Sequence, residues 1–334
     1  FAAFDVFIDA KTGKIVSKIS LSSNANVPGT VETYYNGIKP ITCFYNSYYN
    51  DYVLEDWSRM IGTYDATYSP WANWPPVAYD IWSPSTNFVW DWNEMEKSAG
   101  HDAHWGMEKT YDFYLNTFGR DSYDNQGGPI LQYINPPTHQ AGGTTGPNNA
   151  GAISDGIIGG MTLMVYGLGD GINMDFVTAL DVMGHEFTHN VVAFTAGLIY
   201  EEEYGALNES FADIMGYSIK YATTGVTNWT IGEDLYQWIS NPPSPPIMRS
   251  MSNPHIKGDP DTYQQSTDWL EIIPPFDANN DYGGVHINSG VQNYWFYLLS
   301  QGGSGVNDNG DSYSVTGIGI ADAQQIAYRN LTVY

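Results

Sequence analysis

The run Asp181-Val-Met-Gly-His185-Glu186-Phe-Thr-His189 determines how the rest of this 334-residue sequence is interpreted. His185 and His189 are four residues apart, so on a helix their side chains project from one face, one turn apart. Two imidazoles at that spacing can bind one metal ion, most often zinc. Glu186 follows the first histidine directly, a position suited to a general base that takes a proton from water. The alternative is a helix that carries two solvated histidines.

A second helical segment downstream supplies a third ligand. A catalytic zinc site needs three protein ligands and one open position. After a predicted turn at residues 195–200, the segment that begins near Gly205 carries Glu209, nineteen residues beyond His189. Asp213 lies one turn further, where it can accept a hydrogen bond from a ligating histidine. A helix, a turn and a second helix are therefore predicted to bring three ligands around one point.

The stretch from Asp181 to Asp213 resembles the thermolysin family of zinc endopeptidases, which bind zinc through two histidines and a glutamate. Further segments resemble the family in the same order along the chain: 103–123, 231–234, 249–252, 258–261 and 283–290. The similarity covers most of the chain from about residue 40 to Tyr334. It implies an α+β fold, with a β-rich N-terminal domain, a mostly helical C-terminal domain and the zinc site in the cleft between them.

The resemblance also implies a division of the chain. The pattern of residues 4–20 predicts a strand, a turn at Thr12-Gly13 and a second strand, and the segment is similar to the end of the family's inhibitory propeptide. The resemblance implies that residues 1–26 are a remnant of that propeptide. Residues 27–178 would then form the β-rich N-terminal peptidase domain, and residues 179–334 an incomplete helical C-terminal domain. For residues 1–26, the alternative is an ordinary N-terminal hairpin of the first domain.

Roles for individual side chains follow from the same resemblance. The implied zinc ligands are His185, His189 and Glu209. The implied catalytic residues are Glu186 as general base, His286 and Tyr200 as donors to the developing oxyanion, and Asp281 as the residue that orients His286. The implied partners of the zinc-binding histidines are Asn208 and Asp213. The residues implied to bind substrate are Arg249, Asn149, Ala150, Val182, Ile231, Leu235 and Met248. The resemblance implies that the last four line an apolar pocket, which predicts cleavage on the N-terminal side of large hydrophobic residues.

Two segments depart from the family pattern. The segment expected to pair with the substrate backbone, 148–150, continues into a longer stretch and lacks the aromatic residue that normally follows it. The resemblance implies a double calcium site, but only Asp181 and Glu233 are acidic among its five positions. The other three positions hold Lys220, Asn228 and Thr230. Because two calcium ions need more carboxylates than this, we expect at most one, with the Lys220 ammonium in place of the second.

Other polar groups are interpreted as structural. His101 and His104 are only three residues apart in a predicted helix over 99–115, so we expect them to pack rather than bind metal. Residues 169–175 lack the bidentate glutamate of an EF-hand and are predicted to turn into the first metal-binding helix. We predict antiparallel strands across residues 28–96 and a polar loop between helices at 307–311.

Composition narrows the class of partner. Twelve basic and 37 acidic residues give a formal charge of −25, which argues against nucleic acid and anionic membranes. No apolar run reaches 18 residues, so no membrane span is predicted. Cys43 is the only cysteine, so no intrachain disulfide is expected. With the resemblance, this indicates a secreted, extracellular, monomeric endopeptidase that acts on peptides or proteins and has its own propeptide as inhibitor and folding aid.

Two other functions stay open. The first is a zinc-binding chain that is inactive or inhibited by its propeptide. The second is an extracellular module whose tyrosines and tryptophans contact carbohydrate. The second requires no metal, and the complete ligand set argues against it.

Overall fold

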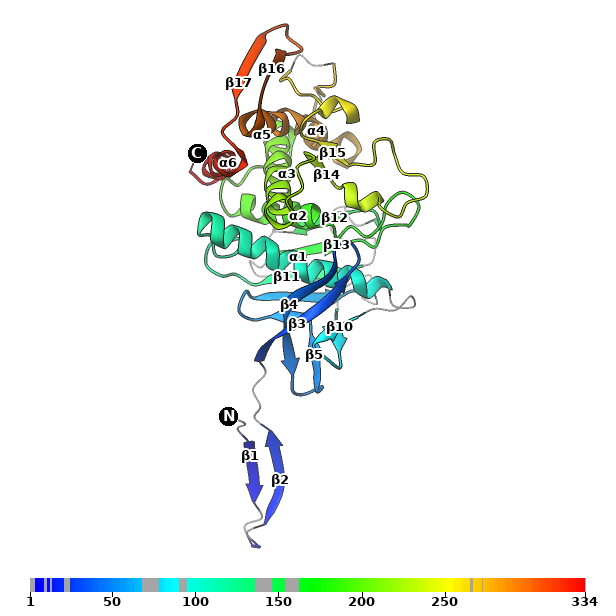
Figure 1. Cartoon of the computed structure of the whole chain (residues 1–334), viewed down its shortest axis with the longest axis vertical. Coiled ribbons are helices and arrows are strands. Elements are labelled where there is room, and N and C mark those ends of the chain that lie inside the picture. Colours follow the sequence, from blue (N-terminus) through cyan, green and yellow to red (C-terminus); the bar gives the residue numbers. More distant parts are fainter. Residues whose placement is uncertain are drawn as a thin grey trace.

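The computed structural model describes residues 4–8, 11–12, 14–20, 25–67, 78–89, 95–135, 146–153, 162–264, 267–271 and 273–333. Within the described residues, 13 of the 17 strands lie between Phe4 and Tyr166, and helices dominate from Leu180 onward (Figure 1). The predicted α+β class, with a β-rich N-terminal part and a mostly helical C-terminal part, is therefore confirmed.

Two larger β-sheets build the N-terminal part. The first has the strand order β10-β3-β4-β5-β9, and the second has the order β12-β13-β11-β7-β6, with β8 paired to β7. The strands of the first sheet are β3 (Ala25–Thr33), β4 (Gly37–Asn46), β5 (Asp51–Val53), β9 (Trp82–Ser83) and β10 (Asn87–Phe88). Those of the second are β6 (Glu55–Asp56), β7 (Ile61–Asp65), β8 (Tyr79–Asp80), β11 (Ile130–Ile134), β12 (Ala150–Ile153) and β13 (Thr162–Tyr166). The short strand β12 is thus the outermost strand at one side of the second sheet.

The prediction of antiparallel strands across 28–96 is only partly right. Strands β3, β4 and β5 pair antiparallel, and so do β6 and β7. However, β10 runs parallel to β3, and β7 runs parallel to β11. A parallel pair needs a long connection that returns the chain to the same end of the sheet. Alternation of side chains is the same in both arrangements, so the sequence pattern does not distinguish them.

Strands β1 (Phe4–Ile8) and β2 (Ile15–Ser20) form a two-stranded antiparallel sheet of their own. The two strands are those predicted for residues 4–20, whereas Gly13 of the predicted turn lies outside the described residues. In Figure 1 the hairpin lies apart from the two larger sheets. The domain boundary expected between residues 26 and 27 falls inside β3.

Helix α1 (Met95–Phe118) carries the two histidines that were expected to pack. His101 is buried, and its Nδ1 lies 2.9 Å from the carbonyl oxygen of Glu32. His104 is also buried, with Nε2 2.9 Å from the carbonyl oxygen of Thr42 and Nδ1 3.0 Å from Oγ1 of Thr63. Both rings are therefore held by hydrogen bonds between the helix and the strands, as predicted.

Helices α2 (Leu180–Ala193) and α3 (Glu202–Thr224) approach each other closely because glycines lie at their contact. A Cβ atom on Gly216 would lie 2.3 Å from the carbonyl oxygen of Asp181. A Cβ atom on Gly184 would lie 2.7 Å from Cδ1 of Ile219. Without side chains at these two positions, the backbones can come near enough for residues of α3 to reach residues of α2.

The remaining elements complete the C-terminal part. They are β14 (Thr230–Ile231), η1 (Glu233–Tyr236), β15 (Arg249–Ser250), η2 (Pro254–Lys257), η3 (Ala278–Asn280), α4 (Asp281–Asn288), α5 (Gly290–Gln301), β16 (Gly302–Val306), β17 (Ser312–Thr316) and α6 (Ile320–Val333). The polar loop at 307–311 was wrongly predicted to lie between helices; it is the turn of the β16–β17 hairpin. Strand β16 reads Gly-Gly-Ser-Gly-Val, a composition with little intrinsic strand preference, so pairing with β17 decides its conformation.

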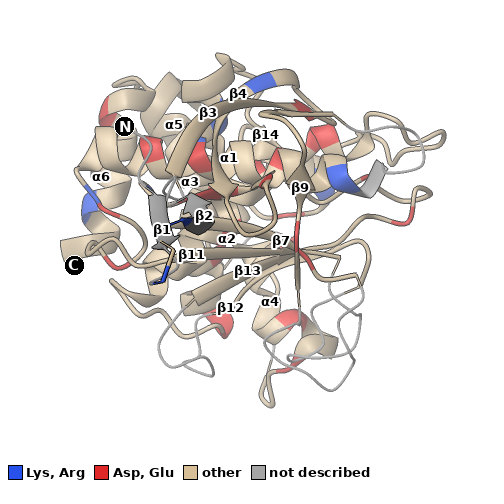
Figure 2. Ribbon diagram, turned by 90° about the horizontal axis from the view of Figure 1, so that it is seen from below, with Lys and Arg blue, Asp and Glu red and all other residues tan. Residues whose placement is uncertain are grey.

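Acidic residues lie on both the strand-rich and the helical parts, with few basic residues among them (Figure 2). The helices that the structure describes are all too short or too polar to cross a lipid bilayer.

The contact between α2 and α3 generates a prediction for Gly216→Ala. Because the added methyl group would meet backbone rather than a movable side chain, the two helices must separate. We expect the free energy of unfolding to fall by about 1–3 kcal/mol. Chemical denaturation measures this, and zinc affinity should fall with it. Thr223→Ala, at an exposed position of the same helix, should change stability by less than about 0.5 kcal/mol. Equal stability of the two variants would contradict this account of the helix contact.

Candidate metal centre and active-site cleft

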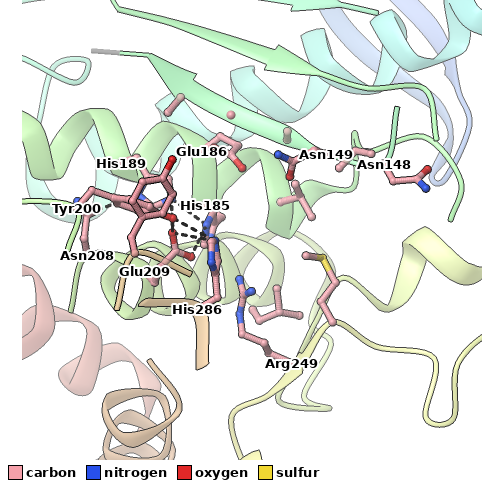
Figure 3. A pocket seen from close by; sticks show the side chains of 18 of the residues that line it. Asn148, Asn149, His185, Glu186, His189, Tyr200, Asn208, Glu209, Arg249 and His286 are labelled. Carbon is pink, nitrogen blue, oxygen red and sulfur yellow. Dashed lines mark hydrogen bonds and ion pairs between the residues drawn. The ribbon is translucent and has the colours of Figure 1, made fainter. Parts of the chain in front are cut away.

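Three ligand atoms from α2 and α3 face one point in the structure. Nε2 of His185 lies 3.0 Å from Nε2 of His189 and 3.3 Å from Oε2 of Glu209 (Figure 3). Nε2 of His189 lies 3.4 Å from Oε1 of Glu209. Zinc bonds of about 2.1 Å in tetrahedral geometry would separate ligand atoms by roughly 3.4 Å. The three side chains proposed as ligands from the sequence therefore lie at the spacing that a zinc ion requires.

The outer nitrogen of each histidine is already occupied. Nδ1 of His185 lies 2.9 Å from Oδ1 of Asp213, and Nδ1 of His189 lies 2.8 Å from Oδ1 of Asn208. Both oxygens only accept hydrogen bonds, so each Nδ1 carries the proton and each Nε2 can present a lone pair inward. Burial disfavours a charged His185, but the Glu209 and Asp213 carboxylates outweigh it and raise the pKa of His185 to about 10. This environment strongly favours positive charge.

The Glu209 carboxylate lacks a partner that an ion would supply. Its Oε2 atom is buried and has no hydrogen-bond partner among the residues described. Its Oε1 atom accepts a hydrogen bond from the Tyr200 hydroxyl, which also lies 3.1 Å from Nε2 of His286. Burial alone would raise the pKa of Glu209, but the neighbouring histidines hold it well below its usual value. A buried, ionised carboxylate with an unsatisfied oxygen fits a metal ligand, so the residues present fit zinc.

A second buried carboxylate, Asp213, joins four elements. Besides His185 on α2, it accepts hydrogen bonds from Arg249 on β15, through Nε and Nη2 at 2.6 Å each. Nδ2 of Asn293 on α5 donates a further bond of 2.7 Å. Burial favours the neutral acid, but Arg249 and His185 outweigh it and lower the pKa of Asp213. The sequence predicted the bond to the histidine but not the contacts to Arg249 and Asn293.

A tight turn positions His286 opposite the metal ligands. Asp281 and Tyr282 have φ angles of 54° and 49°, and Gly283 and Gly284 have φ angles of 93° and 82°. These left-handed conformations favour glycine and fold the chain back on itself. Oδ1 of Asp281 consequently lies 2.5 Å from Nδ1 of His286, and Oδ2 accepts the backbone N–H of His286 at 2.9 Å. Asp281 therefore contacts both the ring and the backbone of the histidine that the resemblance implies it orients.

These groups surround one cavity of about 400 Å³. In the view of Figure 3, Glu186 and Arg249 lie on opposite sides of His185. The predicted residues that line the cavity are His185, Glu186, His189, Tyr200, Asn208, Glu209, His286, Arg249, Asn149, Ala150, Val182, Ile231 and Met248. Leu235 is fully buried and is not among the lining residues, so the structure does not bring it into the predicted pocket.

The lining also includes residues that the sequence did not indicate. Tyr282 lies next to Asp281 in the turn before His286, and its neighbourhood could have suggested it. Met174 and Val177 precede α2 in an irregular segment whose pattern carries no such signal.

Comparison with known proteins agrees with this geometry. Residues 28–193 match the family described as thermolysin metallopeptidase, catalytic domain, and residues 196–334 match thermolysin metallopeptidase, alpha-helical domain.

The chain belongs to the thermolysin family of metallopeptidases.

Individual thermolysin-family proteins resemble the whole chain. Bacillolysin from Bacillus amyloliquefaciens is 35% identical over 334 residues, which are 100% of this chain and 54% of that protein. Extracellular elastase from Staphylococcus epidermidis (strain ATCC 12228 / FDA PCI 1200) is 37% identical over 336 residues, 99% of this chain and 56% of that protein. Thermolysin from Alicyclobacillus acidocaldarius is 35% identical over 345 residues, 98% of this chain and 55% of that protein. The chain thus spans about half the length of these curated relatives.

A solved structure agrees at the level of the fold. The precursor of protealysin, a metalloproteinase from Serratia proteamaculans, has a TM-score of 0.51 and 26% identity. The match covers 83% of this chain and 70% of the other. The match to the catalytic domain ends at residue 193 and the match to the alpha-helical domain begins at residue 196, both after α2. The domain boundary expected from the sequence, between residues 178 and 179, lies before α2.

At the expected calcium positions, this member of the thermolysin family has a lysine among carboxylates. Nζ of Lys220 lies 2.7 Å from Oε1 of Glu233, 2.8 Å from Oδ2 of Asp234 and 3.3 Å from Oδ2 of Asp181. Burial lowers the pKa of Lys220, but the three carboxylates outweigh it and raise the pKa well above its usual value.

Further donors complete this cluster. Asn228 and Thr230 donate to Glu233 at 2.6 and 2.9 Å, and the N–H of Gly232 donates to Asp181 at 2.9 Å. As arranged here, Asp181 and Glu233 fit an ammonium group rather than a calcium ion. The sequence predicted the place of Lys220 but missed Asp234.

The buried lysine generates a prediction for Lys220→Met. The variant leaves the fully buried Asp181 carboxylate without its cation. We expect the free energy of unfolding to fall by about 3–5 kcal/mol. Denaturant titration measures the loss. Lys109→Met, on the half-buried side of α1, serves as the matched control and should cost less than about 0.5 kcal/mol. If Lys220→Met is as stable as the parent, the lysine is not the counter-charge of this cluster.

Proposed function

We propose that this chain is a zinc-dependent endopeptidase that cleaves peptide bonds on the N-terminal side of large hydrophobic residues. The observation that carries this proposal is the convergence of His185, His189 and Glu209 beside Glu186 in one cavity. Membership of the thermolysin family supports the same reaction. A zinc ion held by the three ligands would supply Lewis-acid polarisation of the substrate carbonyl and increase the acidity of a water molecule.

Glu186 acts as general base and then as general acid. It follows the ligand His185 on α2 and lines the cavity without belonging to the ligand group. Its carboxylate takes a proton from the water molecule that attacks the peptide carbonyl carbon. The same proton is then delivered to the leaving amine nitrogen as the C–N bond breaks.

His286 and Tyr200 donate hydrogen bonds to the oxyanion that forms. Nδ1 of His286 faces Asp281, which only accepts, so Nε2 can donate when the ring is doubly protonated. Partial burial of this half-exposed side chain opposes the charge, but Glu209 and Asp281 outweigh it and raise the pKa of His286. Burial and Glu209 also raise the pKa of Tyr200, so its hydroxyl remains a donor. Donors aimed at developing charge lower the barrier without binding the ground state more tightly.

The substrate is held by backbone and apolar contacts. The outermost strand β12 and the preceding Asn149 line the cavity and offer backbone groups to an extended peptide. Arg249, held rigid by Asp213, binds a substrate carbonyl. The apolar side chains of Val182, Ile231 and Met248 on the cavity wall favour a leucine, isoleucine, valine or phenylalanine after the cleaved bond.

Secretion and the division of the chain into a propeptide and two domains are proposed from the relatives. One relative is named extracellular elastase, which supports secretion of this chain. Another is the precursor of protealysin, which supports residues 1–26 as a propeptide that inhibits the enzyme and assists folding. Residues 27–178 and 179–334 are then the two peptidase domains, and the protein acts as a monomer.

The alternative is a zinc-binding chain that is inactive or inhibited by its propeptide. It predicts zinc bound at His185, His189 and Glu209 without turnover of a peptide that contains a Gly-Leu bond. Measurement of zinc content together with hydrolysis of that peptide separates the two functions.

Glu186→Gln is expected to retain zinc but lose activity. The amide cannot take a proton from water, so kcat/KM should fall by about 10²–10⁴-fold. Bound zinc and turnover of the Gly-Leu peptide are measured on the same sample. Glu271→Gln, an exposed position, is the matched control and should behave as the parent. Near-parental turnover by Glu186→Gln would refute the assignment of the base.

His286→Ala is expected to lower kcat by about 100-fold or more, with little change in KM. The reason is that the lost donor acts on charge that appears only in the transition state. Steady-state kinetics separate the two constants, and Tyr200→Phe should show the same pattern more weakly. An effect on KM alone would mean that His286 only binds substrate.

A further inference from the structure

A second group of metal-ligating side chains lies outside the cavity. Among the residues described, two groups bring at least three such atoms within 4.8 Å of one another: the candidate zinc site, and His255 with Asp261 and Asp308. His255 belongs to η2, Asp261 follows η2, and Asp308 lies in the turn between β16 and β17. Asp261, from the same part of the chain, and Asp308, from a distant hairpin, therefore both lie beside the imidazole of His255.

The ligand atoms of this second group lie at a spacing close to that of the first group, and all within 4.8 Å of one another. Nε2 of His255 lies 3.3 Å from Oδ2 of Asp261 and 3.8 Å from Oδ2 of Asp308. In the candidate zinc site, the distances from the two histidine nitrogens to the Glu209 oxygens are 3.3 and 3.4 Å. One atom bonded to all three ligands at about 2.1 Å would produce separations of this size.

The imidazole is oriented as in a metal site. Oδ2 of Asp268 lies 2.7 Å from Nδ1 of His255. Because a carboxylate only accepts, Nδ1 carries the proton and the lone pair of Nε2 can face Asp261 and Asp308. Asp213 has the same relation to His185 in the candidate zinc site.

The charge of the group calls for a cation. Three carboxylates surround His255, so the group would carry a net charge of −2 even with the ring doubly protonated. Thr262 also contacts this group: its Oγ1 donates to Oδ1 of Asp261 at 2.7 Å and accepts the N–H of Asp308 at 3.4 Å. A hydroxyl brings no positive charge, whereas a divalent ion would balance the carboxylates.

We propose that His255, Asp261 and Asp308 bind a second divalent transition-metal ion, with Asp268 as the partner that orients His255. One imidazole with two carboxylates suits zinc better than calcium, which prefers oxygen ligands alone. The His255, Asp261 and Asp308 side chains are 35%, 20% and 33% exposed, so water can reach the ion and complete its shell. By binding ligands from both segments, the ion links the β16–β17 turn to η2.

Metal content tests the site. The intact protein is dialysed against buffered zinc, and zinc per chain is measured by atomic emission. We expect two ions for the parent and one for His255→Gln and for Asp308→Asn. Asp311→Asn removes a carboxylate from the same hairpin outside the group and should keep two ions. Asp268→Asn should weaken the second ion by about 10–100-fold in Kd.

Several outcomes would overturn the site. They are a single ion in the parent, two ions in His255→Gln or Asp308→Asn, or loss of the second ion in Asp311→Asn. Retention of the first ion shows that a variant has folded. Because peptide hydrolysis plays no part in the count, failure of the proposed peptidase would appear separately, as two bound ions without turnover.

Hydrogen exchange tests whether the ion restrains the β16–β17 hairpin. Zinc should slow amide exchange across residues 302–316 in the parent and leave it unchanged in His255→Gln. If the second ion binds without slowing exchange in the parent, the proposed link between the β16–β17 turn and η2 is refuted.

Discussion

The buried carboxylate of Asp213 is the interaction on which the candidate site depends. It receives hydrogen bonds from α2, β15 and α5 while it is itself carried by α3. An ionised group with no access to water must keep such partners, because each lost bond leaves an unsatisfied buried charge. The same carboxylate therefore orients the ligand His185 and anchors the guanidinium of Arg249. Metal binding and substrate binding share one support.

Much of the site could be predicted because its determinants are local. Helix geometry alone places His185 and His189 on one face, and Glu209 and Asp213 one turn apart. These positions depend on spacing within a few residues, so the sequence shows them directly. The contact between Asp281 and His286 is also local, but it was implied by the resemblance to the family and not by spacing.

What could not be predicted depends on contacts between distant segments. Arg249 and Asn293 reach Asp213 only because β15 and α5 pack against α3. The His255 group joins residues more than fifty positions apart, and no spacing rule connects them. The parallel pairing of β10 with β3 and the β16–β17 hairpin were missed for a related reason. Strand pairing is decided by the partner strand as much as by the sequence of the strand itself.

Because of the lysine within the acidic cluster at Asp181, part of the protein's stability does not depend on the concentration of a dissociable metal ion in the medium. A dissociable ion that binds only the native state contributes a stabilisation that grows with its concentration and disappears on dilution or chelation. The ammonium of Lys220 is covalently attached, so its local concentration is fixed when the chain is synthesised. Folding at this position does not wait for an ion to be captured. The helix pair that carries the metal ligands is thereby held by the same counter-charge in fresh water and in brine.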